Sequence, residues 1–94
     1  MNQAIFVPQS LFKIAGKGLL VAGFLKSGVL KVGMVAEIKK QKVNLIGIEA
    51  FNKNLEEVRE TDLAVKSMAI IVPESAEKIF ADSMNQEIIF REPK

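Results

Sequence analysis

Glycines recur at short intervals through the apolar first half of this chain. They stand at positions 16, 18, 23, 28, 33 and 47, and the runs between them are rich in Val, Ile, Leu and Phe. Short apolar runs separated by glycine are typical of short strands joined by tight turns. Gly23, inside an apolar run, indicates a bulge or the close approach of another strand. The spacing therefore predicts a β-rich fold in which at least three glycines adopt a positive φ.

The predicted elements follow one another with short connections. Strands are expected at residues 3–7 (ended by Pro8), 11–15, 19–25, 29–32, 35–39, 42–51, 63–72 and 87–90. Gly16-Lys17-Gly18 and Ser27-Gly28 are expected to be turns, and the polar segment 52–60 to cap one end. After Pro73, Ser75 is a candidate N-cap for a helix over 75–84, with Asn85 in the left-handed position beyond it. The predicted fold is all-β: a single domain over residues 1–94, a small closed β-barrel of about six to eight strands with one short C-terminal helix.

The expected strand over 63–72 is apolar on both faces, although a barrel hides only the inner face of a strand. Its outward residues, either the set with Met68 and Ile70 or the alternate set, therefore need a cover. Either the helix around Ile79 and Phe80 or a second chain would supply it. The candidate interaction surface consists of Met68, Ile70, Ile79 and Phe80.

Composition excludes most catalytic chemistry. The 94 residues include no Cys and no His, which removes disulfides, thiolate nucleophiles and the usual general base near neutral pH. Gly16-Lys17-Gly18 is followed by an apolar run rather than a helix start, so it lacks the phosphate-loop pattern. Asn52-Lys53-Asn54-Leu55 lacks the final acid of the guanine-reading motif of GTPases. We expect no enzyme activity, no nucleotide hydrolysis, no metal site and no cofactor.

The N-terminus shows no basic region followed by an apolar region, so no signal peptide is predicted. The apolar run over 19–25 is far shorter than the roughly 20 residues that a transmembrane helix needs. We therefore expect a cytoplasmic protein that does not enter a membrane.

Charge is unevenly distributed along the chain. Residues 1–53 hold eight lysines against Glu37 and Glu49, whereas residues 54–94 hold five basic and nine acidic side chains. Such asymmetry can mark a nucleic-acid face, which would require the lysines to form one contiguous positive surface. Alternatively, the lysines decorate solvent-facing positions and strand edges, where they discourage edge-to-edge pairing.

Two segments resemble a known family. Residues 12–33, Phe-Lys-Ile-Ala-Gly-Lys-Gly-Leu-Leu-Val-Ala-Gly-Phe-Leu-Lys-Ser-Gly-Val-Leu-Lys-Val-Gly, and residues 48–57, Ile-Glu-Ala-Phe-Asn-Lys-Asn-Leu-Glu-Glu, are similar to the second domain of elongation factor Tu and its relatives. The resemblance covers roughly residues 4–72. It implies a stand-alone copy of the β-barrel that follows the GTPase domain in translational GTPases, and that barrel is a binding platform rather than a hydrolytic domain.

In that family, the residues matching Glu49 and Phe51 help form the pocket for the terminal adenosine and aminoacyl ester of charged tRNA. A carboxylate beside an aromatic ring can hold a base by hydrogen bonding and stacking. The resemblance thus implies a translation-linked, RNA-binding role, with tRNA or a translation component as partner. The candidate RNA or ligand contacts are Glu49, Phe51, Lys53 and Phe24. The alternative interpretation is that Glu49 is simply exposed on a strand and Phe51 packs one end of the barrel.

The chain departs from the family at two places beside this pocket. Ala22-Gly23-Phe24 stands where the family has Thr-Gly-Arg, and Thr61-Asp62-Leu63-Ala64-Val65 stands where it has Gly-Asp/Glu-Asn-Val-Gly. Both changes make this flank more apolar. The alternative function is therefore a protein–protein interaction module that has lost RNA recognition. One version of this alternative is a module that associates with a second copy of itself.

Overall fold

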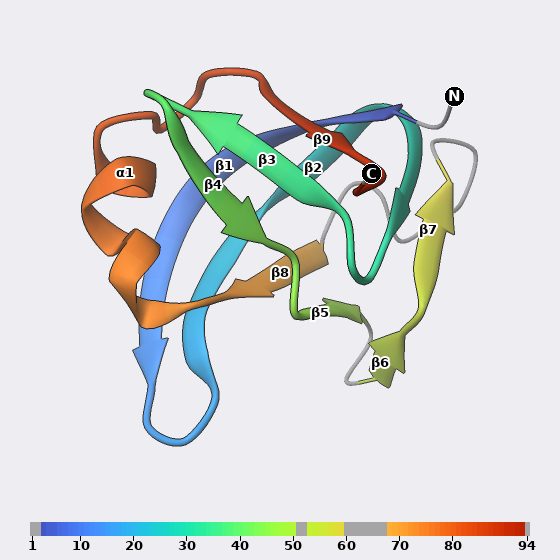
Figure 1. Ribbon diagram of the computed structural model, residues 1–94. Coiled ribbons are helices and arrows are strands. Elements are labelled where there is room, and N and C mark those ends of the chain that lie inside the picture. The colour runs from blue at the N-terminus through green and yellow to red at the C-terminus, as the bar shows by residue number, and fades with distance from the viewer. Residues whose placement is uncertain (1–2, 51–52, 60–67, 94) are drawn as a thin grey trace.

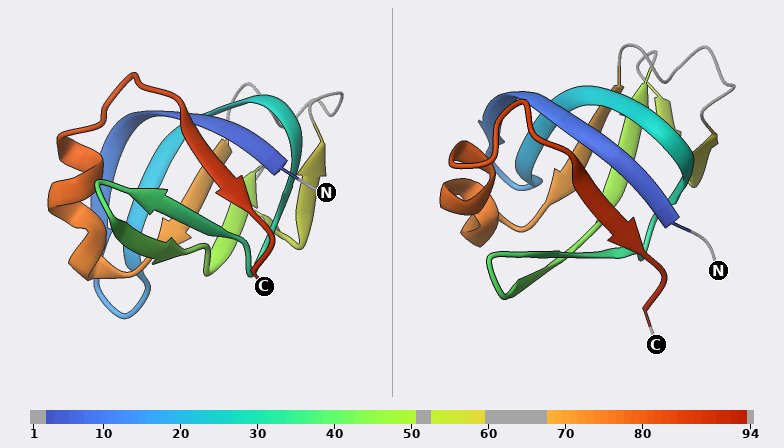
Figure 2. Two further views of the ribbon diagram at one scale, coloured as in Figure 1. Left: turned by 45° about the horizontal axis from the view of Figure 1, so that its top comes forward. Right: turned by 90° about the horizontal axis from the view of Figure 1, so that it is seen from above.

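The computed structural model describes residues 3–50, 53–59 and 68–93. Its framework is a pair of long antiparallel strands, β1 (Gln3–Ile14) and β2 (Gly18–Lys31), joined by a tight hairpin (Figure 1). Alternate residues of β2 face the core, as the buried side chains of Leu19, Val21 and Leu25 show. Both long strands curve around the core (Figure 2), and the shorter strands pair outward from them.

The described sheet has nine strands. The shorter ones are β3 (Val35–Ile38), β4 (Gln41–Asn44), β5 (Gly47–Ala50), β6 (Lys53–Leu55), β7 (Glu57–Arg59), β8 (Met68–Val72) and β9 (Ile88–Arg91). The order of the strands across the whole sheet is β4-β3-β9-β1-β2-β8-β5-β6, and β7 pairs with the end of β2. The prediction of an all-β chain with one short helix is confirmed. A closed barrel is not confirmed, because no ladder among the described residues joins the outer strands β4 and β6.

Pro8 does not end β1, contrary to the prediction. It lies opposite Gly23, next to a register shift between Pro8 and Ser10, and such a bulge tolerates a residue without an N–H group. A Cβ on Gly23 would lie 2.1 Å from the carbonyl oxygen of Val7. The close strand approach predicted at Gly23 is therefore confirmed, and it allows one long strand where two were expected.

Gly28 forms a bend within β2 rather than the predicted turn. Its φ is 87°, and a Cβ there would lie 2.0 Å from the carbonyl oxygen of Gln3. Beyond the bend, residues 29–31 pair with β7. Gly16, Gly18 and Gly33 also have positive φ, so the predicted minimum of three such glycines is confirmed.

The strand expected over 42–51 is divided into β4 and β5. At the corner between them, the Leu45 amide donates to the Met34 carbonyl (2.9 Å) and the Ile46 amide to the Ile71 carbonyl (2.8 Å). The chain thus changes its hydrogen-bonding partner at this corner, where Leu45 is buried and Ile46 is exposed. The polar segment expected as a cap contains β6 and β7, and residues 63–67 of the expected strand over 63–72 lie outside the described residues.

The helix α1 (Glu77–Ala81) follows a 3₁₀ turn at Glu74–Ala76 and is shorter than the predicted helix over 75–84. Ser75 is not its N-cap, because Ala76 occupies that position without a side-chain hydrogen bond. Ile79 and Phe80 belong to the same core cluster as Met68 and Ile70, and these four side chains are at most 8% exposed. The interaction surface predicted from Met68, Ile70, Ile79 and Phe80 is therefore wrong. These residues are core, and α1 packs at one end of it.

Three non-glycine residues of the described chain have positive φ. Asn85 (63°) has the predicted left-handed φ, but it stands four residues after the end of α1 rather than directly beyond the helix. Lys39 (51°) and Lys40 (68°) form the two-residue turn between Ile38 and Gln41. Positive φ at both turn positions defines the type I′ hairpin turn, which favours Asn-Gly. A side chain with a Cβ costs roughly 1–2 kcal/mol per residue in this conformation.

The described part of the chain contains no helix that is long and apolar enough to cross a membrane.

Candidate functional site

The central strands present one face away from the core. Residues that pair across a sheet point to the same side. Val21 and Ile48 both pair with Ile70 and point inward with it, so the neighbours of these residues along each strand point outward. We call this set the outer face of β8. Its members are Ser10, Phe12 and Ile14 on β1, Leu20, Ala22 and Phe24 on β2, Ala69 and Ile71 on β8, and Gly47 and Glu49 on β5.

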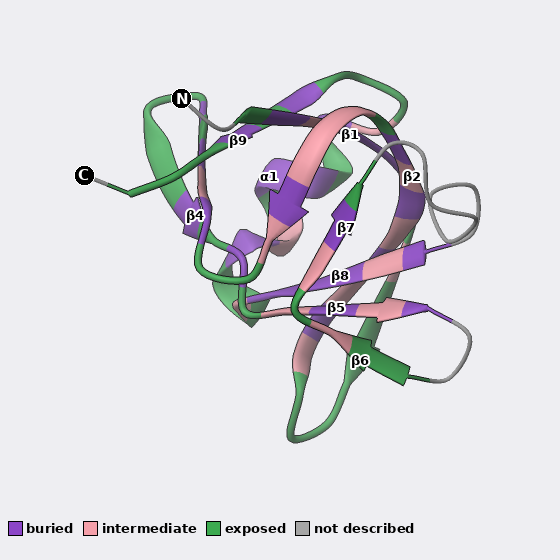
Figure 3. Ribbon diagram, turned by 90° about the vertical axis from the view of Figure 1, so that its right-hand side faces the viewer, coloured by how far each residue is buried: buried purple, intermediate pink, exposed green. Residues whose placement is uncertain are grey.

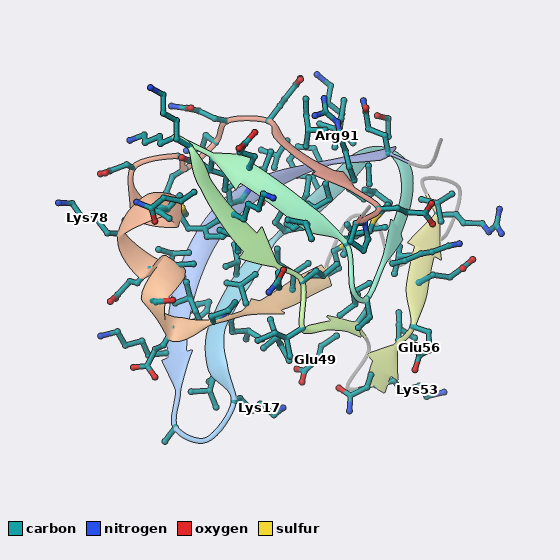
Figure 4. All side chains as sticks on the ribbon, viewed as in Figure 1. Lys17, Glu49, Lys53, Glu56, Lys78 and Arg91 are labelled. Atoms are coloured by element: carbon teal, nitrogen blue, oxygen red, sulfur yellow. The ribbon has the colours of Figure 1, made fainter. Side chains whose placement is uncertain are left out.

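Glu49 lies at the polar edge of this outer face. It stands between the buried residues Ile48 and Ala50, opposite Ala69 on one side and Asn54 on the other. Its side chain is 25% exposed, and its Oε2 accepts a hydrogen bond from Lys17 Nζ at 2.6 Å. Lys17 comes from the β1–β2 hairpin and lies close to Glu49 in Figure 4.

A hollow of ≈ 300 Å³ opens beside Glu49. We call it the Glu49 hollow. Its polar lining comes from Lys17, Glu49, Asn54 and Glu56, and its apolar lining from Val32, Ile46, Ile48, Leu55 and Ile71, together with Gly47. Because Gly47 has no side chain, Ile71 lies directly over it: a Cβ at Gly47 would be 3.2 Å from Ile71 Cδ1. The hollow combines hydrogen-bonding groups with an apolar wall, which suits a small planar or partly apolar group.

The predicted contact residues are only partly brought together. Phe24 lies on the same outer face as Glu49, but on β2, with β8 between the two strands. Lys53 is exposed at the start of β6 opposite buried Ala50, and it is not among the described residues that line the hollow. Phe51 lies outside the described residues.

Sequence reasoning missed Lys17 and Asn54 as neighbours of Glu49. Asn54 lies in residues 48–57, which resemble the family, so this resemblance is the signal that could have identified Asn54 as a site residue. Lys17 was interpreted only as part of a hairpin turn. Its contact with Glu49 depends on the strand order β2-β8-β5, which local sequence does not reveal.

The lysines of the first half do not form one contiguous positive surface in the described chain. Five of the eight pair with acids, and four of these acids come from the last part of the chain. The pairs are Lys13–Glu77, Lys17–Glu49, Lys26–Glu87, Lys31–Glu92 and Lys39–Asp82. The hydrogen bond and charge of Glu77 raise the pKa of Lys13 above its ordinary value. Figure 4 shows Lys17, Lys53 and Lys78 projecting from different sides of the molecule. Folding thus neutralises much of the charge asymmetry, and the contiguous positive surface that a nucleic-acid face over the whole first half would require is not present in the described chain.

Apolar side chains are exposed on the outer face of β8 near the hairpin. Phe12 is 52% exposed and Ile14 38% exposed, and Phe12 is paired with Leu20, which is in turn paired with Ile71. The resulting apolar row crosses three strands. Figure 3 shows the exposed β1–β2 hairpin and β6, which both lie below the better-buried β8 and β5 in that view.

No protein-family model matches the chain. Among solved structures, its fold is similar to that of the translation elongation factor SelB from Methanococcus maripaludis in the apo form. The TM-score is 0.65 at 17% sequence identity, and the match covers 96% of this chain but only 18% of the SelB chain. The likeness shows a fold that occurs within a translation elongation factor. It is consistent with the elongation factor Tu-like domain that the sequence resembles.

Proposed function

We propose that this chain is a non-catalytic binding domain that works in translation, and that the Glu49 hollow holds the terminal adenosine and aminoacyl ester of charged tRNA. The observation that carries the proposal is the position of Glu49, whose carboxylate lies half-buried at the rim of a partly apolar hollow. The fold shared with a translation elongation factor supports the same role.

The size of the hollow sets what it can accept. A volume of ≈ 300 Å³ lies at the low end of small-ligand sites, so the hollow takes one nucleoside-sized group rather than a length of RNA. The Glu49 carboxylate accepts hydrogen bonds from ribose hydroxyls or from the amino group of adenine. Ile46 and Leu55 provide apolar contact for the base or the aminoacyl side chain.

Lys17 bonds only Oε2 of Glu49, so a ligand can donate to Oε1 and can also replace the lysine at Oε2. The Lys17 side chain is 52% exposed, and ion pairs between exposed groups contribute only about 0–1 kcal/mol. The ligand therefore displaces the lysine at small cost. The released ammonium group remains beside the hollow, where it can contact the phosphate that precedes the terminal nucleoside.

The test compares charged and uncharged tRNA on the parent protein, on Glu49→Gln and on Glu37→Gln. Glu37 is an exposed acid on β3 and serves as the matched control. We expect the parent to prefer charged tRNA, and Glu49→Gln to lose about tenfold or more of that affinity, because a hydrogen bond to a charged group is lost. Glu37→Gln should keep the preference. Equal binding of charged and uncharged tRNA by the parent would contradict the proposal.

The second candidate function is a self-associating protein–protein interaction domain. It is favoured by the apolar row on the outer face of β8, where Phe12 and Ile14 stand exposed beside Leu20 and Ile71. Isolated apolar side chains on a surface are normal, but contiguous ones mark contact sites. In this version the row, rather than the Glu49 hollow, is the functional surface.

A further inference from the structure

The β3–β4 turn carries a pair of lysines in a conformation that lysine disfavours. Lys39 and Lys40 both have positive φ, with 51° and 68°. Asn-Gly meets the demands of this turn best, so the fold alone gives no reason for two lysines. Disfavoured backbone conformations concentrate at sites of function, where other gains offset them. The turn is therefore a candidate for a role beyond connecting two strands.

Further lysines gather at the same end of the molecule. Lys42 follows the turn on β4, and Asp82, the partner of Lys39 at 3.5 Å, lies one helical turn after Lys78. Residues four apart share a helix face, so Lys78 faces the same side as Asp82. Figure 1 and both views of Figure 2 show α1 beside the β3–β4 turn. We call Lys39, Lys40, Lys42 and Lys78 the basic tip.

The lysines of the basic tip are largely uncompensated. All four are exposed, and Lys40, Lys42 and Lys78 form no ion pair with any residue that the structure describes. Three acids lie at this end of the molecule: Asp82 pairs with Lys39, Glu37 lies opposite Lys42 in the ladder, and Glu87 lines the same hollow as Lys39 but pairs with Lys26. The tip thus differs from the rest of the surface, where most lysines of the first half are paired.

The chemistry of the basic tip fits phosphate groups better than a protein surface. Protein interfaces have apolar centres and few lysines, whereas the large exposed apolar residues of the described chain lie outside both the turn and α1. RNA backbone contacts are made by Lys together with polar side chains, and Gln41 and Gln86 are exposed nearby. We propose that the basic tip binds the phosphate backbone of RNA, without reading its sequence and independently of the Glu49 hollow.

The test replaces both turn lysines by uncharged residues that favour the turn conformation: Lys39→Asn together with Lys40→Gly. The probe is a fluorescently labelled RNA hairpin without an aminoacyl group, titrated between about 50 and 200 mM salt. We expect weaker binding and a plot of log affinity against log salt that is less steep by about one unit per lysine removed. The melting temperature should rise by several degrees, because Asn-Gly relieves the strained turn.

The control variant removes two lysines that are already paired with acids, Lys13→Gln together with Lys26→Gln, and should keep the parent's affinity and slope. Lys78→Gln lies outside the turn and should lower the slope by about one even if the turn variant fails to fold. An aminoacyl-adenosine analogue should not compete with this probe, which separates the basic tip from the Glu49 hollow. Unchanged binding by the turn variant, or no binding by the parent at about 50 mM salt, would overturn the proposal. Equally strong, tip-dependent binding of polyglutamate would overturn the assignment to RNA.

Discussion

Gly28 and Gly33 separate two effects that single glycines have on this fold. Both have positive φ, but a Cβ at Gly33 would meet nothing within 4 Å, whereas one at Gly28 would lie 2.0 Å from the Gln3 carbonyl oxygen. Replacing Gly33 by Ala adds only backbone strain, and should cost about 1–2 kcal/mol of unfolding free energy. Gly28→Ala should cost at least about 3 kcal/mol, because backbone must also move. Urea denaturation of both variants measures this difference, and equal losses would mean that β1 and β2 do not approach as described.

Among the elements, the long strands show where local signals succeed and where they mislead. Glycine spacing and apolar runs were sufficient to predict an all-β chain, and the signals at Pro73, Ser75 and Asn85 to predict a short helix. They failed at Pro8 and Ser27-Gly28, which resemble strand ends. At both places the ladder between the two strands continues past a bulge, so the chain stays in the strand despite the local turn signal.

The same limit applies to the site. Glu49 was found through the family resemblance, but its neighbours in the hollow come from the hairpin tip, the β4–β5 corner and β6. Their proximity follows from strand order, which long-range pairing determines. Met68 and Ile70 were placed on a surface because a strand that is apolar on both faces does not reveal which face points inward. Pairing with Val21 and Ile48 resolves this point.

The helix α1 has a structural role that one substitution can test. Phe80 is 0% exposed in the core, whereas Phe12 is 52% exposed on β1. Phe80→Ala should destabilise the protein by about 3–5 kcal/mol, because it removes a buried aromatic ring and leaves a cavity. Phe12→Ala, the matched control, should change stability by at most about 0.5 kcal/mol. Thermal or urea unfolding compares the two, and similar losses would show that α1 does not complete the core.

For the molecule as a whole, the apolar row on the outer face of β8 makes the second candidate function testable. If the chain self-associates through this row, light scattering should show an oligomer that Phe12→Lys splits into monomers. The fold should survive, because Phe12 is exposed. Circular dichroism checks this point, and Asn44→Lys, which adds the same charge at an exposed site on β4, controls for charge. A parent protein that stays monomeric at high concentration would exclude this function.

The Glu49 hollow is where we propose that the chain holds the end of a charged tRNA. The most direct measurement is an NMR titration of the labelled protein with a stable aminoacyl-adenosine analogue, in which an amide replaces the ester. We predict saturable shifts confined to the backbone amides of Lys17, Gly47, Glu49, Asn54 and Leu55, with the β3–β4 turn unaffected. Shifts centred on Phe12 and Leu20, or no shifts at ligand saturation, would contradict binding at the Glu49 hollow.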